Sequence, residues 1–318
     1  MSASSMKTGV LVALVLVNIA FAIGWIWAMR RHHLSGRPGL ADIAIGCVTS
    51  FFDTLGIGSF APTTALFKFR GRPPDELIPG TLNVGLNPTA FLETVLFVTA
   101  VAVQPTLLVC MVATATAGAW LGAGVVSRMP RRSIQLFMGV ALLIAAFFFA
   151  MRNVHELSAR HGDVVRFLDI FPPGGEAFGL DGWRFAVAAL VSFVLGALMC
   201  IGIGNYAPLM ILLALLGMHP LAAFPIMMAS DGLLQPVASL GFFRSGRFAH
   251  VSALGLAAGG IVGVLVAFYI VKSLPLTVMR WLVTVVVTYA AVSMLRSRRT
   301  EQAAASARMV HTSGGLQS

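Results

Sequence analysis

The chain has 318 residues, of which 58% are hydrophobic and only 11% are charged, and its formal net charge is +10. A soluble domain carries roughly 25% charged residues because its surface faces water, so this composition excludes a soluble globular protein and predicts an integral membrane protein. The basic residues occur in short tracts between apolar segments, which is typical of cytoplasmic loops and argues against nucleic acid as a partner.

The first apolar segment, residues 9–28, is long enough to cross a hydrocarbon core of ~30 Å as a helix. Lys7 precedes it, as in a signal peptide, but Trp27, Arg30 and Arg31 follow it without a small-residue cleavage site. We therefore expect a retained transmembrane helix.

Further apolar segments follow in two sets, separated by a polar stretch. The first set comprises residues 40–67, 77–103, 105–127 and 132–151, and the second comprises 183–216, 221–243, 251–271 and 275–295. The sequence predicts an N-terminal helix with a basic loop, a first membrane repeat, an outward-facing polar loop, a second membrane repeat and a disordered cytoplasmic tail. Their respective bounds are 1–39, 40–151, 152–182, 183–297 and 298–318.

The two sets are related by an internal duplication. The segment from Gly56 to Pro62 reads GIGSFAP, and 146 positions later the segment from Gly202 to Pro208 reads GIGNYAP. Four further prolines recur at offsets between 145 and 148, namely 74, 79, 88 and 130 with 220, 225, 236 and 275. We infer two repeats of about 110 residues.

The distribution of basic residues indicates how each repeat crosses the bilayer. If segments 40–67 and 183–216 each enter, break and leave by the same face, the short basic tracts place fourteen Lys and Arg side chains on one side, opposed by Lys7 and Lys272. If both segments cross fully, the basic residues divide evenly, which is unusual in membrane proteins. We therefore predict an all-α polytopic membrane protein with two inverted repeats, each a re-entrant broken-helix hairpin plus three transmembrane helices, preceded by one extra N-terminal helix. Its N-terminus is expected outside and its C-terminus in the cytoplasm.

The paired Gly-x-Gly…Pro motifs are the strongest candidates for a binding site. Glycine and proline destabilise a continuous helix, and freed backbone groups inside a bilayer must be buried in protein or line a wet cavity. A half-helix beginning near Pro62 or Pro208 directs free N–H groups and a positive dipole end at the break, where an anion can bind. Close helix packing by small residues is the alternative interpretation.

Neutral polar side chains follow both motifs. Asn83 and Asn87 share one helix face and Thr81 precedes them, while Ser230 and Gln235 occupy the corresponding place in the second repeat. Such groups donate hydrogen bonds to an oxyanion without a fixed charge, although hydrogen bonding between helices is an equally valid role.

Three acids, Asp53, Glu93 and Asp231, fall inside predicted membrane segments. A charge at the bilayer centre costs at least ~2.5 kcal/mol, so each needs a partner, a proton or a task. We expect them to couple transport to protons. Capping of the broken backbone is the alternative role of Asp53.

Other chemistry has no support in the sequence. There is no P-loop for ATP and no His-Glu-x-x-His motif, and Cys47, Cys110 and Cys200 lie far apart in apolar segments. We expect no cofactor, no metal and no enzymatic activity.

The repeated hairpin motifs, together with the segment from Gly118 to Arg132, resemble the sulfite exporter TauE/SafE-like family of membrane permeases. The resemblance implies transport of sulfite, organosulfonates or related sulfur oxyanions. It places substrate-binding positions at Gly56, Gly58, Ser59 and Pro62, and at Gly202, Gly204, Asn205 and Pro208. The family's hairpin often carries three consecutive glycines, whereas this chain has bulkier Ser59 and Asn205, a departure that bears on substrate more than on fold.

The sequence thus predicts an inner-membrane secondary transporter for a small anion, with the lipid bilayer as its surroundings and a second copy of the chain left open as a partner. A membrane-embedded assembly subunit without transport is the alternative. An intramembrane enzyme would need a catalytic dyad that the sequence does not contain.

Overall fold

The computed structural model describes residues 3–32, 36–126, 177–199 and 206–314, together with isolated positions between 136 and 154. These parts of the chain form α-helices and short 3-10 turns, and they contain no β-strand beyond a single bridge between Ala177 and Met218. The predicted all-α class is confirmed.

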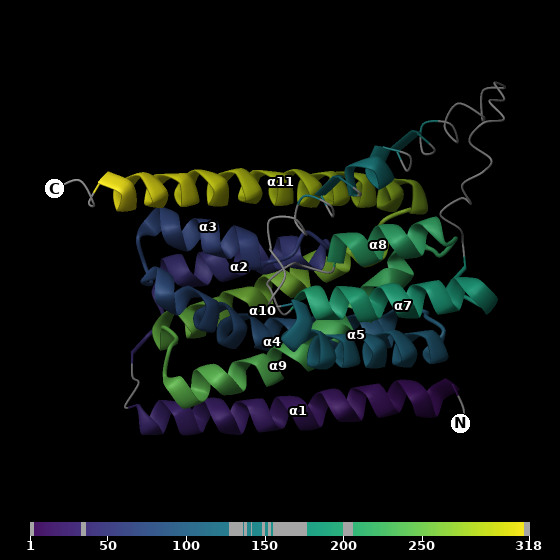
Figure 1. Ribbon diagram of the computed structural model, residues 1–318. Helices are drawn as coiled ribbons and strands as arrows, with labels where there is room; N and C mark the ends of the chain where they lie inside the picture. Colours follow the sequence, from purple (N-terminus) through teal and green to yellow (C-terminus); the bar gives the residue numbers. More distant parts are fainter. Residues whose placement is uncertain are drawn as a thin grey trace.

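The helices lie side by side and run along one common direction (Figure 1). In chain order they are α1 (Ala3–Arg31), α2 (Leu40–Thr54), α3 (Phe60–Arg70), α4 (Ile78–Ala100), α5 (Pro105–Val126), α7 (Gly182–Met199), α8 (Tyr206–Leu215), α9 (Ala223–Ser245), α10 (His250–Ser273) and α11 (Leu276–Gly314), with 3-10 turns η1 (Asp75–Leu77) and η3 (Pro220–Ala222).

Five of the described helices are long and apolar enough to cross a membrane, in α1, α7, α9 with η3, α10 and α11. Helix α4 has 23 residues but a more polar sequence, and most of its side chains are buried. Because α4 is surrounded by other helices, its polar side chains meet protein rather than lipid. The chain is therefore a multi-pass membrane protein.

The two ends of the bundle differ in charge. At one end, which we call the basic end, α1, α3 and α9 finish in Arg31, Arg70 and Ser245, and the Ala249 N–H donates to Thr81 Oγ1 at 2.9 Å. At the opposite end, Lys7 Nζ donates to the carbonyl of Val101 at 3.3 Å. Residues 177–181 pack there against the start of α5 and the end of α8.

Helices α2 and α3 form a hairpin that opens at the basic end. Helix α2 ends at Thr54, α3 starts at Phe60, and the turn between them contains Gly56 and Gly58 at φ +90° and +87°. At the open end, Arg70 of α3 forms an ion pair with Asp42 of α2. The hairpin α7–α8 lies toward the opposite end of the bundle (Figure 1).

Three helix pairs hold the bundle together: α2 with α10, α5 with α7, and α4 with α9. The first two pairs approach closely through glycine. A Cβ on Gly259 or Gly263 of α10 would overlap backbone of α2, and a Cβ on Gly118 of α5 would overlap backbone of α7. Small residues permit such approach in membranes, where dispersion contacts between helices replace the hydrophobic effect.

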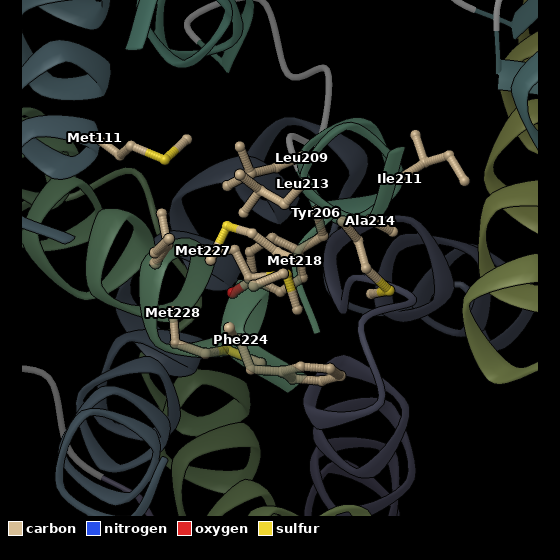
Figure 2. Packing of buried hydrophobic residues seen from close by; sticks show 14 of the residues in the cluster. Met111, Tyr206, Leu209, Ile211, Leu213, Ala214, Met218, Phe224, Met227 and Met228 are labelled. Atoms are coloured by element: carbon tan, nitrogen blue, oxygen red, sulfur yellow. The ribbon is translucent and has the colours of Figure 1, made fainter. Parts of the chain in front are cut away.

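The apolar core is rich in methionine around α8 and α9. Met227 and Met228 of α9 and Met218 lie together with Phe224 (Figure 2), and each is fully buried, as is Met210 of α8. Methionine is flexible and polarisable, so it fills the irregular space beside an interrupted helix.

The structure differs from the sequence-based expectation in residues 298–318, for which we expected a disordered tail. Helix α11 continues without interruption to Gly314. Its last part is rich in Ala and Arg, both good helix formers, and it contains no proline or glycine before Gly314. These propensities extend the helix beyond the apolar segment.

Candidate functional site

The break between α2 and α3 is the centre of the candidate site. Glu93 of α4, Asp231 of α9 and Tyr206 at the start of α8 surround the end of α2, and all three are buried. Four elements that are distant in sequence thus place polar side chains around one interruption of the helical backbone.

The first acid, Asp53, belongs to the last turn of α2 and is 3% exposed. Its Oδ2 accepts a hydrogen bond of 2.6 Å from the hydroxyl of Ser59, the residue that precedes α3. The Gly56 N–H donates to the Asp53 carbonyl at 2.7 Å. Asp53 therefore holds both sides of the break together, as expected for the capping role, while its carboxyl also faces the helix start.

The second acid, Glu93, is fully buried on α4. Its Oε1 lies 2.6 Å from Thr54 Oγ1, and its Oε2 has no hydrogen-bond partner among the described residues. Thr54 Oγ1 also lies 2.8 Å from the carbonyl oxygen of Ser50. A carbonyl oxygen only accepts, so Glu93 receives at best a shared hydrogen from this hydroxyl.

The third acid, Asp231, is better supplied with donors. Tyr206 Oη donates to Asp231 Oδ2 at 2.9 Å, and Gln235 Nε2 donates to the same oxygen at 3.1 Å. The Gln235 Oε1 atom has no partner among the described residues. Asp231 therefore joins α8 to α9 through one carboxylate oxygen.

The three carboxyl groups, which we call the acidic cluster, lie near enough to interact electrostatically. The ion pairs Arg70–Asp42 and Lys68–Asp75 involve none of them. No group of His, Cys, Asp and Glu in the described ranges is arranged to hold a metal ion. Among the described residues, hydrogen-bond donors and bound protons can offset the negative charge of the acidic cluster.

The backbone at the break offers donors of its own. Helix α3 has eleven residues, and in its first turn the N–H groups of Phe60 and Ala61 have no acceptor one turn back, while Pro62 has no N–H. Space around Gly58 is open, because an added Cβ would meet nothing within 4 Å. Gly56 in contrast lies against the side-chain methyl of Met210 of α8.

The structure brings only part of the predicted site together. Gly56, Gly58 and Ser59 lie at the break with Asp53 and Glu93, and Pro62 falls in the first turn of α3. From the second repeat, Asp231 and Gln235 join them through Tyr206, and Pro208 lies in the first turn of α8. Gly202, Gly204 and Asn205 lie outside the described residues.

The other predicted binding residues form hydrogen bonds within their helix or to a neighbouring helix. Thr81 and Asn83 lie near the basic end, where Thr81 Oγ1 donates to the Leu77 carbonyl and Asn83 Nδ2 to the Pro79 carbonyl. Asn87 Nδ2 donates to Asn18 Oδ1 of α1 at 2.9 Å. Ser230 Oγ donates to the Ile226 carbonyl within α9. All four have the helix-to-backbone or interhelical bonds that we considered as the alternative to substrate binding.

Three contributors were missed by sequence reasoning. Tyr206 lies inside the repeated motif, so its polar hydroxyl next to Pro208 was a signal. Thr54 directly follows Asp53, but a threonine near a helix end carries no specific signal of its own. Asn18 is a lone amide in an apolar helix, a feature that marks a buried contact.

An apolar helical bundle with a buried polar centre at a broken helix is a multi-pass membrane protein whose polar side chains gather inside the bundle. Residues 1–149 match the family model described as Sulfite exporter TauE/SafE. The resemblance seen in the sequence is thereby confirmed for this part of the chain, which includes the hairpin α2–α3 and helix α4. No curated protein and no solved structure matches the chain significantly.

Proposed function

We propose that the protein is a secondary transporter that carries a small sulfur oxyanion, such as sulfite or an organosulfonate, across the cytoplasmic membrane. The observation that carries the proposal is the break between α2 and α3, where the N-terminus of α3 meets the buried acidic cluster. The family match supports an exporter of anions.

Two inverted repeats provide the alternating access that such a transporter needs. The helix pairs support this relation, because α2 with α10 and α7 with α5 are equivalent pairs in a duplicated chain. Gly118 faces the Phe193 carbonyl and Gly263 faces the Cys47 carbonyl. The two glycines are 145 positions apart and their partners 146, which are the offsets of the sequence repeat.

An anion fits the break for electrostatic reasons. The N-terminus of α3 carries roughly half a positive charge and directs N–H groups at the space beside Gly58. The hydroxyl of Ser59 adds a donor that is now used by Asp53. A sulfonate or sulfite group, with three acceptor oxygens, can take these donors.

The acidic cluster makes anion binding dependent on protons. A negative charge at the break is repelled by an ionised Asp53 and tolerated by a protonated one. Binding of the anion therefore favours binding of a proton, and by linkage a proton favours the anion. We infer that Asp53, Glu93 and Asp231 carry the coupling proton, with Asp53 closest to the anion.

The orientation follows from charge. Placing the basic end in the cytoplasm leaves Lys7 and Lys272 at the opposite face and agrees with the positive-inside rule. The N-terminus is then outside and the C-terminus inside.

The test is uptake of labelled anions into proteoliposomes that contain the purified protein. Sulfite itself titrates near neutrality, so the key probe is a short alkylsulfonate, whose charge is constant between about pH 5 and pH 8. We expect uptake that saturates and that rises by about tenfold as the pH falls across this range. Absence of flux for sulfite, sulfate and alkylsulfonates would instead favour a non-transporting assembly subunit.

Asp53→Asn is the matched variant, because its amide accepts from Ser59 but carries no charge. Its uptake is expected to vary by less than about twofold over the same pH range. A wild-type pH profile in Asp53→Asn would remove this residue from proton coupling.

A further inference from the structure

Helix α1 stands outside both repeats, yet it reaches the polar centre through one side chain. Asn18 lies midway along α1, and its amide contacts three helices. Its Nδ2 donates to the Leu14 carbonyl of its own helix at 2.9 Å and to the Gly232 carbonyl of α9 at 3.3 Å. Its Oδ1 accepts from Asn87 Nδ2 of α4 at 2.9 Å. Both amide hydrogens and the amide oxygen are therefore in use.

The bond to Gly232 replaces one that α9 cannot form itself. Pro236 lies inside α9, and proline has no N–H. In a regular helix the N–H of residue 236 would donate to the carbonyl of residue 232. The Asn18 amide supplies that missing donor from a neighbouring helix, which is how proline is tolerated in membrane helices.

The repaired carbonyl is adjacent to the acidic cluster. Gly232 follows Asp231 directly and precedes Gln235 by three residues, so the kinked turn carries both groups. The backbone of Gly232 also lies against Thr94 Oγ1, next to Glu93 on α4. Thr94 Oγ1 in turn lies 2.7 Å from the Met228 carbonyl of α9. A shift of this turn would move Asp231 relative to Glu93.

We propose that Asn18 is a positioning residue for the acidic cluster: by bridging Asn87 and the Gly232 carbonyl, it sets the distance between Glu93 on α4 and Asp231 on α9. The inference rests on the proposed function for its role in transport. The groups that face this region are Asp53 from α2, Glu93 from α4, Tyr206 from α8 and Asp231 from α9. Among the described residues of α1, this turn meets the neutral amide of Asn18 and the apolar side chain of Leu14, neither of which titrates.

The test compares Asn18→Ala with Ile19→Ala, a neighbouring change on the exposed face of α1, where Ile19 is 51% exposed. Dicyclohexylcarbodiimide reacts with protonated carboxyls in apolar surroundings, and mass spectrometry follows its attachment to Glu93 and Asp231 as a function of pH. We expect Asn18→Ala to move the midpoint of Asp231 labelling by about half a pH unit or more. Ile19→Ala should leave the midpoint at its wild-type value.

Pro236→Ala provides a specific rescue, because alanine at position 236 restores the backbone N–H that donates to the Gly232 carbonyl. The midpoint in the double variant Asn18→Ala/Pro236→Ala should return toward that of Pro236→Ala alone. An unchanged midpoint in Asn18→Ala, or a shift that Pro236→Ala does not reduce, overturns the inference.

Uptake of the alkylsulfonate separates this inference from the proposed function. If wild type transports, Asn18→Ala should slow uptake by roughly fivefold to tenfold and alter its pH profile. Wild-type uptake and a wild-type pH profile in Asn18→Ala would count against a positioning role for Asn18. If wild type shows no flux, the proposed function fails, and the labelling experiment still decides whether Asn18 positions the carboxyl groups.

Discussion

Thr54 has one hydroxyl hydrogen and two acceptors within reach, the Ser50 carbonyl and the Glu93 carboxyl. The Ser50 oxygen cannot donate. The short contact to Glu93 is therefore compatible with a protonated carboxyl that donates to Thr54 Oγ1. Sharing of one hydrogen is the alternative, and Thr94 does lie 2.7 Å from two carbonyl oxygens. Glu93 is in this respect unlike Asp231, which accepts from two side chains.

Glu93→Gln distinguishes these two states. If Glu93 is protonated, glutamine is a neutral isostere that donates to Thr54, and Tm should stay within about 2 °C of wild type. If Glu93 is ionised, glutamine removes a buried charge next to two other acids, and Tm should rise by several degrees. Thermal unfolding in detergent measures the difference. Alkylsulfonate uptake by a folded Glu93→Gln should lose part of its pH dependence.

The acids of the site could be chosen from the sequence, but their partners could not. Asp53, Glu93 and Asp231 stand out because charge is rare and costly in apolar segments. Thr54 does not, because hydroxyl side chains in membrane helices commonly bond to their own backbone, as Thr49 does here. Asn83, which the sequence predicts as a binding residue, also makes such a local bond.

At the level of elements, glycine determines how closely α10 approaches α2. A Cβ at Gly259 would overlap the Ile43 carbonyl, whereas a Cβ at Gly241 of α9 would meet nothing within 4 Å. We predict that Gly259→Ala destabilises the protein by about 1–3 kcal/mol through overpacking, a fall in Tm of roughly 5 °C.

Gly241→Ala is the control, since it makes the same chemical change at an open helical position. Alanine is a better helix former by ~1 kcal/mol, so Tm should be unchanged or higher. Equal effects of the two substitutions would mean that the close approach of α2 and α10 does not contribute to stability.

The elements were predictable where the pattern was strong and local. The interruption within residues 40–67 followed from Gly56, Gly58 and Pro62, and the structure ends α2 at Thr54 and starts α3 at Phe60. The extension of α11 to Gly314 was not expected. There the polar composition suggested disorder, while helix propensity after an apolar span favours continuation.

On the scale of the whole molecule, the equivalent pairs α2–α10 and α7–α5 mean that each hairpin packs on a helix of the other repeat. Movement of one hairpin then requires sliding along a surface that the other half provides. The predicted duplication is compatible with this packing of each hairpin on a helix of the other repeat. The sequence alone could not reveal the packing, because no local pattern encodes which of the later helices faces α2.

The same architecture predicts which ends are reached from which side of the membrane. Ser245 at the end of α9 and Ser273 at the end of α10 are both exposed, and they lie at the basic and the opposite end, respectively. In a background in which Cys47, Cys110 and Cys200 are replaced by alanine, we would introduce Ser245→Cys or Ser273→Cys. An impermeant maleimide added to intact cells should label Ser273→Cys and leave Ser245→Cys unlabelled until the membrane is opened. Reversed labelling would invert the proposed orientation. Labelling of both from outside would mean that α10 does not cross the bilayer, and the inverted-repeat arrangement would then be wrong.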